Sequence, residues 1–184
     1  MNLRHLLPLL ALSACPAPET GDDGVFFWRL TESSLAFGAC TDDPRFRDDV
    51  TPFAIGENSF IIYRVSEDGK AAATLSCTHV DVSTCAESAD HIPWEVAGQE
   101  LTRSQTFTDS VADAGCDMQQ VVTETLIDKG QTMTLDVVNV LTLINTTPGS
   151  GVCEDLDAAT RSRSTNGFGV EGCVISRQLK GAAP

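Results

Sequence analysis

The chain has 184 residues, with 26 acidic side chains against 12 lysines and arginines, and a formal net charge of −14 at neutral pH. Apolar residues make up 42% and charged residues 21%, which is typical of one globular domain and excludes collagen-like and disordered chains. The negative charge argues against nucleic acid as a partner and against electrostatic attraction to anionic lipid, because both require a basic surface.

Residues 1–15 have the order of an export signal. A cation at Arg4 precedes an apolar run from Leu6 to Leu12, and small residues then lead to Cys15. This order is typical of a secretory signal peptide. The run is much shorter than the ~20 residues of a spanning helix, so we expect export without a transmembrane anchor.

The end of this leader, Leu12-Ser13-Ala14-Cys15, resembles the lipobox of bacterial lipoproteins, in which the cysteine is lipidated and the leader is cut before it. The resemblance implies a signal peptide over residues 1–14 and a lipidated Cys15 with a flexible tether over 15–24, rich in Pro, Gly and acidic residues. Pro16 stands where enterobacterial lipoproteins retained in the inner membrane carry aspartate, which implies the outer membrane of a Gram-negative bacterium. The alternative is a signal peptide with a cysteine that coincides with its cleavage point.

Six further cysteines follow, and an even number in an exported chain predicts three disulfides. They are Cys40, Cys77, Cys85, Cys116, Cys153 and Cys173. Sequence proximity favours the pairs Cys77–Cys85 and Cys153–Cys173, which leaves Cys40–Cys116. A zinc site of Cys77, His79, Cys85 and His91 is the alternative, but the irregular spacing of these residues does not favour it, and we expect no metal.

From residue 25 onward, short runs rich in Val, Ile, Thr and Phe alternate with turn residues, which predicts an all-β domain over 25–180 and a short tail over 181–184. The predicted strands cover 25–30, 59–66, 71–78, 92–96, 100–107, 118–127, 132–144 and 170–179. Three hairpins are expected, at residues 67–70, 97–99 and 128–131. Acidic residues early and a base late predict a short helix over 153–162.

Asn139 interrupts an otherwise apolar face of the predicted strand 132–144, whose other members include Val137 and Leu141. A buried polar side chain needs a hydrogen-bonding partner. Asn139 therefore either satisfies the backbone near a bulge or marks a lined cavity.

About eight antiparallel strands, then a short helix and a last strand, predict a barrel that closes on itself. The order of elements, with Trp28 on the first strand, resembles a lipocalin-type (calycin) β-barrel. The Gly-X-Trp start of that family is absent, because Phe26 occupies the glycine position. The alternative is an immunoglobulin-like β-sandwich.

No arrangement of residues points to catalysis. No serine lies in a Gly-X-Ser-X-Gly motif and no glycine-rich loop precedes a helix, so we expect a protein that is not an enzyme and uses no cofactor. A calcium site in the acidic loop from Thr41 to Asp49 is the one further metal alternative, although the spacing is not that of an EF-hand.

Two functions from different classes therefore remain. In the first, the barrel interior binds a small apolar ligand, and the candidate lining residues are Trp28, Phe60, Ile62, Trp94, Val96 and Phe107. In the second, the protein is a structural or interaction lipoprotein that binds an envelope partner and has no small-molecule ligand. A cavity of about 300 Å³ or more favours the first function, whereas a packed interior removes it.

Overall fold

The computed structural model describes residues 24–46, 53–57, 59–77, 84–88, 92–112 and 115–184. The strands are β1 (Val25–Phe37), β2 (Phe60–Val65), β3 (Ala71–Cys77), β4 (Cys85–Glu87), β5 (Trp94–Ala97), β6 (Glu100–Ala112), β7 (Cys116–Asp128), β8 (Thr132–Asn145) and β9 (Val174–Ala182). The helices are the 3-10 helix η1 (Pro44–Phe46) and the α-helix α1 (Val152–Arg163). The predicted all-β fold with one short late helix is confirmed.

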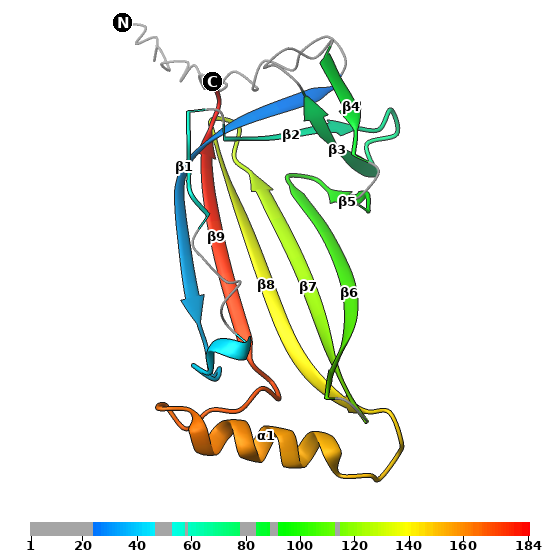
Figure 1. Cartoon of the computed structure of the whole chain (residues 1–184). Coiled ribbons are helices and arrows are strands. Elements are labelled where there is room, and N and C mark those ends of the chain that lie inside the picture. Colours follow the sequence, from blue (N-terminus) through cyan, green and yellow to red (C-terminus); the bar gives the residue numbers. More distant parts are fainter. Residues whose placement is uncertain (1–23, 47–52, 58, 78–83, 89–91, 113–114) are drawn as a thin grey trace, which may run out of the picture.

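Eight of these strands form a closed antiparallel barrel. They follow the order β2-β1-β9-β8-β7-β6-β5-β3, and pairing of β2 with β3 completes the ring, while β4 lies outside it on β3. Figure 1 shows the long strands β1 and β6–β9 as one curved wall, with the shorter β2, β3 and β5 at one end. Closure confirms the predicted barrel and excludes the sandwich.

The predicted hairpins form where turn residues meet the strands. Between β2 and β3, Asp68 Oδ1 accepts hydrogen bonds from the Ser66 hydroxyl at 2.7 Å and from the Lys70 backbone N–H at 3.1 Å. Gly69 lies between Asp68 and Lys70 and has a φ of 70°, a conformation that favours glycine. The β5–β6 and β7–β8 turns lie at the same end of the long strands, which we call the turn end.

The outer bounds of the first and last strands differ from the prediction. β1 continues past Leu30 to Phe37 through a bulge, because its second half pairs with β9. The last strand begins at Val174, after Cys173, and not at Val170. Both differences come from pairing between the two ends of the domain, which local residue patterns do not contain.

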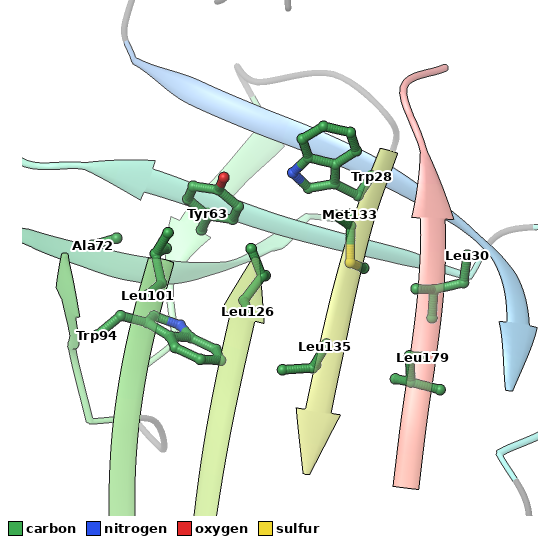
Figure 2. Close-up of a cluster of buried hydrophobic side chains, with 10 residues drawn as sticks. All are labelled: Trp28, Leu30, Tyr63, Ala72, Trp94, Leu101, Leu126, Met133, Leu135 and Leu179. Carbon is green, nitrogen blue, oxygen red and sulfur yellow. The ribbon is translucent and has the colours of Figure 1, made fainter. Parts of the chain in front are cut away.

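An apolar core fills the turn end. Figure 2 shows its ten buried side chains: Trp28, Leu30, Tyr63, Ala72, Trp94, Leu101, Leu126, Met133, Leu135 and Leu179. They come from all eight strands of the ring, so burial of this one cluster holds the closed end together.

Helix α1 runs across the opposite end of the barrel, which we call the helix end (Figure 1). Its first turn is fixed by Asn145 at the end of β8, whose Oδ1 accepts the Cys153 backbone N–H at 2.9 Å and whose Nδ2 donates to Glu154 at 2.8 Å. This side chain supplies the capping that Gly151, at the N-cap position, cannot. The helix therefore begins where β8 can reach it.

Three disulfides are present, as predicted, but two of the predicted pairings are wrong. Cys77–Cys85 forms inside the β3–β4 hairpin, as expected. The other bonds are Cys40–Cys173 and Cys116–Cys153, in place of Cys40–Cys116 and Cys153–Cys173. The observed bonds join the end of β1 to the start of β9, and the start of β7 to α1, so both brace the helix end.

Candidate functional site

The barrel interior changes character along its axis. Strand register stacks inward-facing residues in layers, and the core layer nearest the helix end contains Leu101, Leu126, Leu135 and Leu179. The next layer toward the helix end contains Arg103, Glu124, Val137, Arg177 and Leu35. The following one contains Gln105, Val122, Asn139, Ile175 and Phe37. The interior therefore passes from the apolar leucine layer, which belongs to the core, to a mixed layer within one step along the strands.

The first mixed layer is ordered by Arg103. Its guanidinium pairs with the Glu124 carboxylate, donates to Thr74 Oγ1 at 3.1 Å, and lies 4.1 Å from the centre of the Trp94 ring. Trp94 Nε1 donates to the same Thr74 hydroxyl at 3.0 Å. This network places a polar surface on the helix-end side of the core without leaving these charges unpaired.

A cavity of about 470 Å³, which we call the cleft, occupies the helix half of the barrel. Its volume lies within the range of small-molecule sites. Its apolar lining residues are Leu35, Pro44, Phe46, Met118, Val122, Val137, Leu141 and Ile175, and its polar lining residues are Arg45, Asp109, Gln120, Asn139 and Arg177. The strands β1, β6, β7, β8 and β9 and the helix η1 all contribute.

The cleft forms because the short strands β2, β3 and β5 close the ring only near the turn end and do not extend to the helix end. Among the described residues, β2 pairs with β1 over Val25–Arg29 and β5 pairs with β6 over Glu100–Thr102, near the turn end. The remaining halves of β1 and β6 stand apart in Figure 1, and η1 lies near the end of β1. A second apolar cluster, which includes Cys40, Leu141 and Cys173, packs on the helix-end side of the cleft.

Asn139 is a polar residue of the cleft whose hydrogen bonding is incomplete. Its side-chain oxygen is buried and has no hydrogen-bond partner, although the residue lines the cavity. Of the two sequence interpretations, the structure therefore favours the lined cavity over a bulge, since β8 pairs regularly with β7 and β9 at this residue. A buried acceptor left unpaired costs about 1–3 kcal/mol.

The charged groups of the cleft wall are unequal in what they can offer. The Arg45 guanidinium binds both oxygens of Asp43, at 2.5–3.2 Å, and this contact lowers the pKa of the Asp43 carboxyl. Arg45, in η1, is thus already paired with the acid that directly precedes this helix. Asp109 and Arg177 lie on β6 and β9 and give the wall one carboxylate and one further cation.

The structure does not bring the six predicted lining residues together. Trp28 and Trp94, 1% and 3% exposed, fill the solid core. Phe60 and Ile62 face outward and pack in a third cluster beside the Cys77–Cys85 hairpin. Val96 borders a different hollow at the turn end, and Phe107 is 44% exposed on β6. None of the six is among the residues that line the cleft.

The sequence patterns considered above identified Asn139 but none of the other polar cleft residues, although the sequence contains a signal for them. Alternate residues of the predicted strands place Gln120 and Glu124 on the same face as the apolar Met118, Val122 and Leu126. Polar residues at inward positions of a barrel strand indicate a wetted interior. Arg177 follows the same rule on β9, two residues after Ile175.

The metal alternatives find no support in the described part of the chain, where no three His, Cys, Asp or Glu side chains are grouped to hold an ion. Cys77 and Cys85 are consumed by their disulfide, and His79 and His91 lie outside the described residues. In the acidic loop, the Asp42 carboxylate binds Ser164 and Thr165. Asp48, Asp49, Cys15 and the leader are also outside the described residues.

Among the described residues, no helix is both long and apolar enough to cross a bilayer. Comparisons of the chain with protein-family models, with curated proteins and with solved structures find no match.

Proposed function

We propose that this protein is an exported, lipid-anchored binding protein, with no catalytic role, that holds a small amphipathic molecule in the cleft. The observation that carries the proposal is a cavity of about 470 Å³ beside a packed core, with the buried and unpaired side-chain oxygen of Asn139 in its wall. A ligand that donates a hydrogen bond to this oxygen would remove the cost of leaving it unpaired.

The wall chemistry refines the expected ligand. An apolar ligand matches residues such as Leu35, Met118 and Ile175, but it would leave the buried side-chain oxygen of Asn139 without a partner. A molecule with an apolar body and at least one hydroxyl or amide N–H satisfies both the apolar residues and Asn139. We therefore propose an amphipathic ligand in place of the apolar one expected from the sequence.

The cellular location that we propose is the one that the first residues of the chain imply. The lipobox Leu12-Ser13-Ala14-Cys15 supports anchoring to the cell envelope, with the outer membrane of a Gram-negative bacterium as its destination. Three disulfides support a compartment that is oxidising. This proposal includes the signal peptide, acyl chains such as palmitate on Cys15, and the membrane as the partner of the lipid anchor.

Native mass spectrometry of the full lipidated protein, extracted from its own envelope in mild detergent, tests the binding function. We expect a small molecule on the wild-type protein and its loss from Asn139→Leu. The matched control is Gln119→Leu, which removes an amide from the outward face of β7 and should retain the ligand. Retention by Asn139→Leu, or a bare wild-type protein, would contradict the proposal.

The second candidate function, an interaction lipoprotein without a small ligand, is favoured by β6. Residues 104–110 of this strand are all exposed, and the exposed Phe107 lies at their centre. An exposed strand edge can pair with another chain. The same mass spectra would then show a protein partner on the wild type, and Phe107→Lys would remove it.

A further inference from the structure

A second hollow lies at the turn end of the barrel, on the other side of the core from the cleft. Its volume is about 1060 Å³, and we call it the turn-end bowl. Its wall combines an apolar surface with a carboxylate, through Phe26, Tyr63, Val65, Val96, Leu101 and Asp128. The bowl belongs to neither of the functions proposed above.

Asp128 is the unusual member of this wall because it is a nearly buried acid, 9% exposed. Its Oδ1 accepts the Gly130 backbone N–H at 2.7 Å, which fixes the β7–β8 turn, and its Oδ2 accepts the Tyr63 hydroxyl at 3.0 Å. Among the described residues, no basic side chain forms an ion pair with it. Each carboxylate oxygen retains a lone pair, so the acid can accept further hydrogen bonds.

Tyr63 keeps this acid in place and adds an aromatic surface. Burial raises the pKa of the Tyr63 phenol above its usual value, and the nearby Asp128 carboxylate raises it further, so the hydroxyl remains a donor. The Tyr63 ring stacks on Phe26, with ring centres 5.0 Å apart. Aromatic rings beside a carboxylate are the surroundings that attract organic cations.

The charge around the bowl has the same sign. Glu67 and Arg64 also line the bowl, and their formal charges cancel, which leaves the charge of Asp128 as the net charge of the lining. The whole chain carries −14, and a field of that sign concentrates cations and repels anions. A cation that enters the bowl would neutralise an acid that no basic side chain of the described residues neutralises.

We propose that the turn-end bowl binds a small organic ammonium ion with an apolar body. The ammonium group donates hydrogen bonds to Asp128, and the apolar body lies against Phe26, Tyr63 and Val96. The site takes a cation because of its acid, and it selects organic amines over inorganic cations because of its apolar wall.

Three matched probes test this site by calorimetric titration of the purified protein. Phenethylamine carries the cation, phenethyl alcohol is neutral, and 3-phenylpropionate is an anion on the same aromatic body. We expect phenethylamine to bind at least about tenfold more tightly than the alcohol, which is the effect of a charge-assisted hydrogen bond, and 3-phenylpropionate not to bind. Equal binding of amine and alcohol, or no binding of the amine, overturns the proposal.

Asp128→Asn provides the second arm, because asparagine has the same shape without the charge and keeps one acceptor oxygen, which can still accept the Gly130 backbone N–H. We expect this variant to lose the preference for the amine, with its fold confirmed by circular dichroism. Asp109→Asn, which removes a carboxylate from the cleft, should bind phenethylamine like the wild type, as should Asn139→Leu. Wild-type affinity of Asp128→Asn for phenethylamine overturns the proposal. Because Asn139→Leu changes the cleft and not the bowl, it distinguishes failure of the bowl as a site from failure of the cleft.

Discussion

At the scale of single residues, Asp42 shows how a loop acid can be structural without being a metal ligand. Its carboxylate accepts the Ser164 hydroxyl at 2.6 Å, the Thr165 backbone N–H at 3.0 Å and the Thr165 hydroxyl. These hydrogen bonds, led by that of Ser164, lower the pKa of Asp42 to about 2. The carboxylate thereby ties the chain after β1 to the turn after α1.

This lowered pKa predicts a pH-dependent contribution to stability. An acid with a depressed pKa stabilises the fold fully above its unfolded pKa, near 4, and loses this contribution as the pH falls through its folded value, about 2. We expect Asp42→Ala to lower the free energy of unfolding above pH 4, and the difference from wild type to shrink toward pH 2. Denaturant unfolding over a pH series measures it, and Glu67→Ala, an exposed turn acid, controls for charge. A difference that does not vary with pH would refute the assignment.

The opposite effect on the free energy of unfolding is expected at Asn139, because its buried oxygen destabilises the ligand-free protein. Replacement by leucine, similar in volume, should raise the free energy of unfolding by about 1 kcal/mol, since the unpaired acceptor is gone. Thermal or denaturant unfolding of ligand-free protein measures this gain, with Gln119→Leu as the control for added apolar surface. A destabilised Asn139→Leu would mean that the amide already has the partners it needs.

At the scale of elements, the disulfides divide into one local bond and two that connect distant segments. Their sequence separations are 8 residues for Cys77–Cys85, 37 for Cys116–Cys153 and 133 for Cys40–Cys173. The entropy removed from the unfolded chain grows with the loop that a bond closes, to about 2.5, 4 and 5 kcal/mol respectively. We expect the paired Cys→Ser variants to lose stability in this order.

Unfolding of the three double variants, each with its other two bonds intact, measures the order directly. The Cys40–Cys173 variant should also lose protection of β1 and β9 amides from hydrogen exchange, because that bond closes the β1–β9 pairing at the helix end. Greatest loss of stability in the Cys77–Cys85 variant would contradict the chain-entropy argument for this fold.

These bonds also show which parts of the fold the sequence could predict. The Asp68-Gly69 hairpin and the helix were predictable, because turn residues and charge order act locally. The pairing of Cys40 with Cys173 was not, because it follows from the register Phe37↔Ile175 between the first and last strands of the ring. Proximity along the chain therefore selected the wrong partners.

The candidate site was predictable only in part for a related reason. Asn139 was visible as a polar interruption of an apolar face, because it and its neighbours belong to one strand. The aromatic residues were assigned to a lining by type, and a large buried ring fills a core as readily as it lines a cavity. Whether Trp94 meets a ligand or another side chain depends on the strands opposite, which only the closed ring specifies.

At the scale of the whole molecule, the two ends of the barrel are held together by different means. The three short strands β2, β3 and β5 complete the ring at the turn end, where the apolar core is packed. Toward the helix end the five long strands continue, and two disulfides and α1 brace a half that contains the cleft. The crosslinks lie where a cavity reduces packing, so they stabilise the half that the core cannot.

The last prediction concerns where the whole molecule resides. Cys15 carries the only thiol of the lipobox, so Cys15→Ser should prevent lipidation and move the protein from the membrane fraction to the soluble fraction. Fractionation of cells that produce either form measures this shift, and metabolic labelling with a radioactive fatty acid should mark the wild type but not Cys15→Ser. Ser13→Ala, which keeps a small residue in the lipobox, is the matched control and should remain labelled and bound. Membrane partition of Cys15→Ser would refute the anchor.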